Sequence, residues 1–285
     1  MVKYQLLSKS HGKETQSGAQ RLKVFNPGIL LSFLLALAPA TAATNSNFIK
    51  VGITNKCPYF CEGQENSGYI SEILQKAAKI SGQKIKFVMV PELRVVDLLK
   101  KGVFDVTILP SGVLRKNPKI FNLKAQVGVH FLALASFGNK ELLESFDNLK
   151  GKTVVFSGGN HHKELLDKKL ENLNKGNKNL LTHLTGKNST IRQQKMIEQE
   201  RADVIISDFN ILSFYNLRRH RRSKMTIVPS SIGGFTPLLL TSSKKDEAIV
   251  TFGEAVSTYL QKSRQSGELD SILKKYNISD WDQYY

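Results

Sequence analysis

The chain has 285 residues, with 41 lysines and arginines against 24 aspartates and glutamates, and a formal net charge of +17. This length suffices for one large domain or for two small ones, each with its own core. The basic residues are dispersed, and neither a basic stripe interleaved with aromatics nor a zinc-finger spacing is present, which argues against nucleic-acid binding. The one dense basic cluster, 218–222, is predicted to be a solvated loop.

The first 42 residues have the pattern of a secretory signal peptide. Arg21 and Lys23 precede the apolar run 29–38, and the small residues 40–42 follow as a cleavage site. A membrane anchor is the alternative, but the run is shorter than the roughly 20 residues that a spanning helix needs, and Pro39 ends it. We expect export to the periplasm and cleavage after Ala42, which leaves 36 basic and 23 acidic residues and a net charge of +13.

The segment from 48 to 137 alternates strand and helix patterns. A helix is predicted at 69–80, and a second one begins at Pro91, with Leu93, Val96 and Leu99 as its buried stripe, and ends at Gly102. Strands are predicted at 48–53, 84–90, 106–109 and 127–137. This alternation is typical of an α/β fold.

A second unit of the same kind begins at Phe146. From there to the end of the chain, strands are predicted at 154–156, 204–206, 225–228 and 235–240. Helices are predicted from His161 to about 173 and at 190–200, 246–263 and 267–275. The last two helices are expected to pack back on the first unit.

The segments 98–108 and 196–206 repeat one pattern, in which an apolar helical run breaks at a polar turn and is followed by an Asp and a β-branched strand. A helix followed directly by a strand is half of a βαβ unit, and parallel sheets built from these units bind ligands at the carboxyl ends of their strands. The repeat therefore predicts two similar α/β lobes whose crevices face each other. Asp105 and Asp203 are interpreted as structural residues of the two turns.

With these motifs, the chain resembles the extracytoplasmic (periplasmic) solute-binding proteins of ABC importers, family 3, of the polar amino-acid-binding type. The segments that carry the resemblance are Gly68–Ile73, Pro91–Asp105, Leu149–Gly159, Met196–Asp208 and Gly267–Tyr276. The resemblance implies a two-lobed type II α/β fold, with a mainly parallel sheet flanked by helices in each lobe and two crossing segments as the hinge. It implies a first lobe at 43–135 and 234–285 and a second lobe at 136–233.

The resemblance also implies how a solute is held. Amino-acid-binding members clamp the ligand carboxylate with an Arg after the third strand and the ammonium with an Asp in the second lobe, positions approached here by Arg115 and Asp208. Ser111, in the same segment as Arg115, is a further predicted ligand-binding residue. A surface position is the alternative for Arg115, and Arg94 is then the substitute.

The turn Gly159-Asn160-His161 precedes a helix, where free backbone N–H groups favour an anion. An ordinary turn capped by Asn160 is the alternative. In the family, aromatic rings near Tyr59 and Phe60 contact the ligand, and packing at the base of a loop is the other interpretation of these two residues. The sequence offers no matching third ligand for a metal beside the histidines, so no metal and no cofactor are expected.

Cys57 and Cys61 are the two cysteines of the chain, and an oxidising compartment favours a disulfide between them. Redox catalysis is disfavoured, because three residues separate the cysteines instead of two.

The leading hypothesis is a monomeric, non-enzymatic protein that captures a small amino-acid-like solute by hinge closure and delivers it to an ABC permease. A ligand-sensing module for a membrane receptor is the first alternative. An enzyme on the same fold, similar to cyclohexadienyl dehydratases with a carboxylate in the cleft as general acid, is the second.

Overall fold

The computed structural model describes residues 48–61, 67–138, 140–157, 160–173, 181–186, 188–218 and 224–284. The predicted signal peptide at 1–42 and positions 219–222 of the basic cluster lie outside these ranges. Among the described residues, no helix is both long and apolar enough to cross a membrane.

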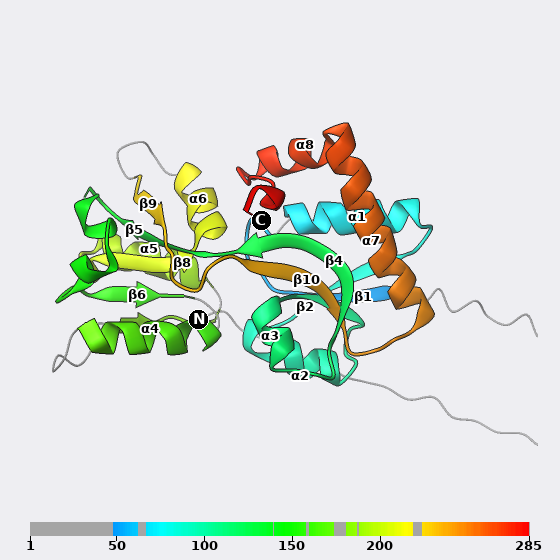
Figure 1. Ribbon diagram of the computed structural model, residues 1–285, viewed down its shortest axis with the longest axis horizontal. Helices are drawn as coiled ribbons and strands as arrows, with labels where there is room; N and C mark the ends of the chain where they lie inside the picture. The colour runs from blue at the N-terminus through cyan, green and yellow to red at the C-terminus, as the bar shows by residue number, and fades with distance from the viewer. Residues whose placement is uncertain are drawn as a thin grey trace, which may run out of the picture. The chain divides into compact units, whose positions relative to one another are not determined.

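The described residues form two five-stranded sheets (Figure 1). The first has the strand order β2-β1-β3-β10-β4, in which β1 pairs in parallel with β2 and β3 while β10 runs antiparallel to β3 and β4. Its strands are β1 (Ile49–Ile53), β2 (Ile85–Met89), β3 (Val106–Pro110), β4 (Phe121–His130) and β10 (Thr236–Ser242). We call this sheet and the helices packed on it the first lobe.

The second sheet repeats the arrangement. Its order is β7-β6-β8-β5-β9, in which β6 pairs in parallel with β7 and β8 while β5 runs antiparallel to β8 and β9. Its strands are β5 (Leu132–Ser136), β6 (Val154–Phe156), β7 (Leu181–His183), β8 (Val204–Asp208) and β9 (Thr226–Pro229). This sheet and its helices are called the second lobe. In both sheets four of the five strands share one direction, which agrees with the mainly parallel sheets expected from the sequence.

Two segments cross between the sheets (Figure 1). Strand β4 ends at His130 and β5 begins at Leu132, so the first crossing segment has Phe131 as the single residue between the two strands. The return runs from the end of β9 at Pro229 to the start of β10 at Thr236. These are the two crossing segments that the resemblance implies.

Helices cover both faces of each sheet. The first lobe contains α1 (Tyr69–Ile80), η1 (Glu92–Arg94), α2 (Val95–Lys100), α3 (Ser111–Arg115), α7 (Glu247–Ser266), α8 (Glu268–Lys275) and η5 (Trp281–Tyr284). Helices α1, α7 and α8 share one apolar cluster with the sheet, and α2 and α3 belong to a separate cluster around Leu99 and Phe104. The second lobe contains η2 (Glu141–Leu143), η3 (Phe146–Leu149), α4 (Asn160–Leu173), α5 (Ser189–Glu198) and α6 (Phe209–Leu217).

The two repeated turns make the same contact. The Asp105 carboxylate accepts a hydrogen bond from the backbone N–H of Lys50 at 2.9 Å, and the Asp203 carboxylate accepts one from the backbone N–H of Thr153 at 2.7 Å. Each Asp ties the start of its strand to the neighbouring parallel strand. This confirms the structural interpretation of both residues.

The helix predicted from Pro91 differs in detail from the structure. It opens with the 3-10 turn η1 and becomes α-helical only at Val95. Because a 3-10 turn advances three residues per turn instead of 3.6, Leu93 is displaced from the face that Leu99 buries. The expectation that Leu93 is buried was wrong, since its exposed fraction is 63%.

The loop between β1 and α1 is closed by a disulfide between Cys57 and Cys61. Tyr59 and Phe60, inside this loop, are both buried. Gly68 has a φ of +108°, and a Cβ there would lie 2.4 Å from the carbonyl oxygen of Tyr59, so only glycine lets the loop approach α1 this closely. The loop is thereby fixed against the first lobe, with Tyr59 directed toward the second.

Candidate functional site

Two adjoining cavities lie where the strands β1, β3 and β8 end. The smaller has a volume of about 320 Å³ and the larger about 550 Å³. The residues that line both are Thr54, Lys56, Glu92, Leu93, His130 and Ile211. Crevices at the carboxyl ends of parallel strands are the usual ligand sites of open α/β sheets, and these two cavities are the candidate site.

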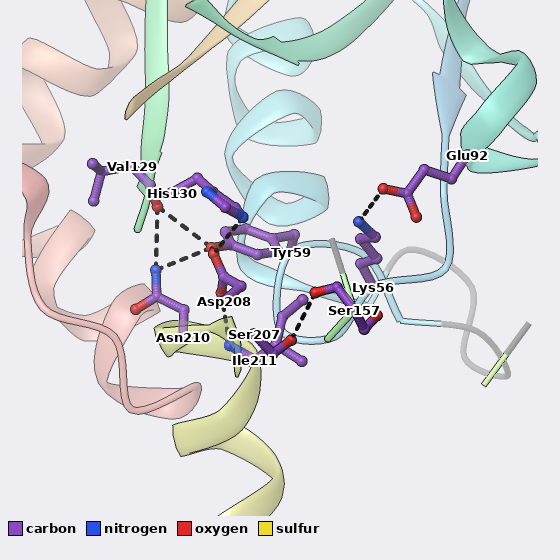
Figure 2. A network of polar contacts seen from close by, with 10 residues as sticks. All are labelled: Lys56, Tyr59, Glu92, Val129, His130, Ser157, Ser207, Asp208, Asn210 and Ile211. Carbon is purple, nitrogen blue, oxygen red and sulfur yellow. Dashed lines mark hydrogen bonds and ion pairs between the residues drawn. The ribbon is translucent and has the colours of Figure 1, made fainter. Parts of the chain in front are cut away.

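Asp208 ends β8 and caps α6, and it is 2% exposed. Its Oδ1 accepts a hydrogen bond from the backbone N–H of Ile211 at 2.9 Å, and its Oδ2 accepts one from the phenol of Tyr59 at 2.8 Å (Figure 2). Asn210 completes the network, because its Nδ2 donates to Tyr59 Oη at 3.1 Å and to the backbone oxygen of Val129 at 3.3 Å. The network links the disulfide loop of the first lobe to the start of α6 in the second.

Burial controls the charge of this carboxyl group. Desolvation raises the pKa of Asp208 from 3.8 to about 6, and the hydrogen bonds from Ile211 and Tyr59 oppose this rise. The nearby charge of Lys56 opposes it as well. Burial also raises the pKa of Tyr59 well above its usual value, with the charge of Asp208 as a further cause. Tyr59 therefore remains a neutral donor at physiological pH.

His130 is the last residue of β4 and lies beside the crossing segment. Its Nε2 is 3.4 Å from Asp208 Oδ2, and its ring stacks on that of His162 in α4, with centroids 4.8 Å apart. His130 lines both cavities, which places an imidazole where the two lobes meet.

Two cationic side chains, those of Lys56 and Arg94, line the larger cavity. Lys56 Nζ forms an ion pair with Glu92 at 2.5 Å, so its charge is balanced within the protein (Figure 2). Arg94 is exposed and lines the larger cavity. Of these two side chains, Arg94 is the better placed to meet an anionic group of a ligand.

Some of the predicted site residues line the cavities and others do not. Tyr59 and Phe60 line the smaller cavity, and Arg94 and Asp208 line the larger one. Ser111 and Arg115 line neither. The side chain of Arg115, the last residue of the five-residue helix α3, is exposed.

The predicted anion-binding turn is described only in part. Gly159 lies outside the described residues. Asn160 and His161 form the first turn of α4, and their side chains are not described. The role of these three residues in binding an anionic group stays a prediction.

Sequence reasoning missed several residues of the cavities, above all Lys56, Glu92 and His130. Neither Lys56 nor Glu92 stands out in the sequence, because a pair 36 positions apart is recognised only after folding. His130 had a signal, since it interrupts an apolar run just before the crossing segment. Among the described residues, no group of three or more His, Cys, Asp or Glu side chains is arranged to hold a metal ion.

Neither a protein-family model nor a curated protein sequence matches the chain. Solved structures do match. A putative L-cystine ABC transporter protein from Listeria monocytogenes is similar with a TM-score of 0.63 and 21% identity, over 82% of this chain and 98% of that one. The GluR0 ligand-binding core from Nostoc punctiforme, in complex with L-glutamate, is similar with a TM-score of 0.62 and 15% identity, over 80% of this chain and 98% of that one.

A third similar structure is a histidine kinase sensor domain that itself resembles periplasmic binding proteins, with a TM-score of 0.61 and 17% identity over 80% of this chain and 95% of that one. At these identities the likeness concerns the fold. The chain thus has the two-lobed fold of periplasmic binding proteins, which confirms the expected fold class.

Proposed function

We propose that the protein, with its two-lobed binding-protein fold, is an exported solute-binding protein that captures a small amino-acid-like solute and delivers it to an ABC permease. The observation that carries the proposal is the pair of adjoining cavities at the strand ends, lined by residues of both lobes. Their volumes lie in the range of about 300–1,000 Å³ that is usual for small-molecule sites. The signal-peptide pattern of residues 1–42 supports the periplasmic location.

The larger cavity has the groups that a zwitterion needs. Arg94 offers a planar guanidinium to a carboxylate, and Asp208 offers a carboxylate to an ammonium. The second lobe adds hydroxyl groups, because Ser157, Ser189 and Ser207 line the same cavity. Ser157 Oγ lies 2.8 Å from Ser189 Oγ, so these hydroxyls already form a polar wall.

A thermal-shift screen of the purified protein against amino acids tests solute binding. A ligand that binds only the folded state at 100 times its Kd stabilises it by about 2.7 kcal/mol. For a chain of this size, we expect a rise in Tm of several degrees. The absence of a shift with every amino acid, at millimolar concentration, would contradict the proposal.

Uptake measurements test the permease role. We expect deletion of the gene to abolish high-affinity uptake of the solute that the screen identifies. Unchanged uptake would favour the alternative function, in which the protein presents its bound solute to a membrane receptor.

An enzymatic function is a second candidate, favoured by one observation. A carboxyl group with a pKa of about 6 that lines a cavity can act as a general acid at neutral pH, and Asp208 has this property. We propose binding without conversion, because the hydrogen bonds that Asp208 accepts from Tyr59 and Ile211 favour the ionised carboxylate, which can pair with an ammonium but has no proton to donate. Recovery of the solute unchanged after long incubation supports binding, and conversion of the solute by the protein, lost in Asp208→Asn, supports the enzyme.

A further inference from the structure

We infer that the solute carries an apolar group, of the size of a branched aliphatic or aromatic side chain, which the smaller cavity binds. This inference rests on the proposed function and narrows it, because it names the class of amino-acid-like solute. It departs from the polar amino-acid type that the sequence resemblance suggests.

The wall of the smaller cavity is mostly apolar. Residues of the first lobe form most of it, among them Ile53, Phe60, Val96, Ile108, Val113 and Leu238. They come from the ends of β1 and β3, the disulfide loop, α2, α3 and β10. A ligand group in this cavity is thus surrounded by aliphatic and aromatic carbon, and apolar surface removed from water there favours binding.

Three polar side chains of this wall, those of Thr107, Asn117 and Tyr59, already have partners. Thr107 Oγ1 donates to the backbone oxygen of Gly52 at 2.7 Å, and Asn117 Nδ2 donates to the backbone oxygen of Val113 at 2.8 Å. The Tyr59 hydroxyl is engaged with Asp208. A polar ligand group that entered the cavity would lose its water without gaining these groups as partners.

The charged side chains at the rim of the cavity are paired as well. Lys56 contacts Glu92 at 2.5 Å, and Lys116 of the first lobe contacts Glu164 of α4 at 3.6 Å. The Lys56 and Glu92 side chains are about one third exposed, so both charges remain in contact with water while they face each other. A charged ligand side chain has to compete with these pairs.

Large apolar side chains are exposed to water where the cavities meet and open. Leu93 is 63% exposed and lines both cavities. Met89 of the first lobe and Ile191 of the second are 49% and 39% exposed, and both line the larger cavity. Apolar surface gathered around a cavity from two lobes is typical of a binding site for an apolar group.

The two cavities therefore bind different parts of the solute. The larger one, with Arg94, Asp208 and the serine hydroxyls, suits the charged head group, and the smaller one suits the side chain. Because Leu93 and His130 line both, one molecule of the size of leucine or phenylalanine can span them.

Matched amino acids test the inference in a thermal-shift titration of the whole protein. Leucine and asparagine have similar size, and so do methionine and glutamine, but one member of each pair has a polar side chain. We expect leucine, methionine or phenylalanine to raise Tm at concentrations at least tenfold lower than asparagine, glutamine, glutamate or lysine. If only polar amino acids stabilise the protein, the inference is wrong and the proposed function stands. If none does, both fall.

Two variants of Val113 test the cavity itself. Val113→Phe fills it, and Val113→Thr adds a hydroxyl group at nearly constant volume and serves if the larger substitution prevents folding. Val103→Phe is the matched control, since Val103 is 43% exposed and lines neither cavity. We expect at least a tenfold loss of affinity for the best apolar amino acid in the Val113 variants and none in the control. Equal affinity in all of them would place the apolar group elsewhere and overturn the inference.

Discussion

The phenol of Tyr59 donates a hydrogen bond to the carboxylate of Asp208 over 2.8 Å, although the two residues lie 149 positions apart. Tyr59 belongs to the disulfide loop of the first lobe, and Asp208 ends strand β8 of the second and caps the helix that follows it. Both are buried. This contact joins the two lobes at the floor of the candidate site and makes the position of α6 depend on the loop that contains Tyr59.

Tyr59→Phe removes the donor and leaves a buried carboxylate with one partner fewer. A hydrogen bond to a charged group contributes about 1.5–3 kcal/mol, so we expect urea unfolding to show a loss of that order. Tyr69→Phe is the matched control. The two rings are 5.6 Å apart, and the Tyr69 hydroxyl is buried without a hydrogen-bond partner among the described residues. The control is expected to be neutral or slightly stabilising, and an equal loss in both variants would refute the role of the bond.

The stability of the protein should fall as pH rises from about 4 to above 6. The pKa of Asp208 is about 6 in the folded state, against an ordinary value of 3.8 for an aspartate in an unfolded chain. In this window the folded state binds more protons than the unfolded state, so raising the pH destabilises the fold. The full effect is on the order of 3 kcal/mol. The free energy of unfolding, measured across this pH range for the protein and for Asp208→Asn, tests the prediction. The difference between the two proteins contains the contribution of Asp208, because His130 and the other titrating groups are present in both. A constant difference would contradict the raised pKa.

Arg94→Ala and Arg115→Ala should separate the two candidate partners of a solute carboxylate. Arg94 lines the larger cavity, whereas Arg115 is exposed and lines neither cavity. The loss of a charge-assisted hydrogen bond costs about 1.5–3 kcal/mol, or roughly ten- to hundredfold in affinity. We expect calorimetric titration to show this loss for Arg94→Ala alone. A loss confined to Arg115→Ala would restore the assignment made from the resemblance.

Replacing both cysteines by serine should weaken solute binding clearly while lowering the stability of the fold only modestly. The disulfide closes a loop with a sequence separation of four, for which chain entropy gives about 2 kcal/mol of stabilisation. The loop holds Tyr59 and Phe60 against the smaller cavity, and the substitution frees both. We expect a modest fall in Tm and a clear rise in Kd. An unchanged Kd would show that packing on α1 alone positions the loop.

Much of the fold could be predicted from the sequence, because the signals are local. The repeated turns at 98–108 and 196–206 combine a helix end, an Asp and a β-branched strand, and each signal lies within a dozen residues. The structure gives both turns the same backbone contact through Asp105 and Asp203. The 3-10 turn at Glu92–Arg94 escaped prediction, because the apolar spacing of Leu93, Val96 and Leu99 fits an α-helix and the sequence carries no sign of the tighter turn.

The site was less predictable, because its contacts join distant segments. Asp208 was expected to face a ligand ammonium, which stays a prediction, and it lines the larger cavity. Its roles as cap of α6 and partner of Tyr59 depend on the packing of two lobes. Arg115 is exposed and lines neither cavity, although Gly112 and Val113 of the same short helix line the smaller one. Which residues of so short a helix face a cavity cannot be read from their spacing. The apolar wall of the smaller cavity draws on several separate segments, none of which differs from an ordinary core segment by itself.

The most direct test of solute binding between the lobes is a crystal structure of the protein with the amino acid that stabilises it most. We expect the carboxylate of the amino acid to lie within hydrogen-bond distance of Arg94 and its side chain to occupy the cavity between Phe60, Val96 and Val113. A molecule bound at another surface, or with its carboxylate in the apolar cavity, would contradict this expectation.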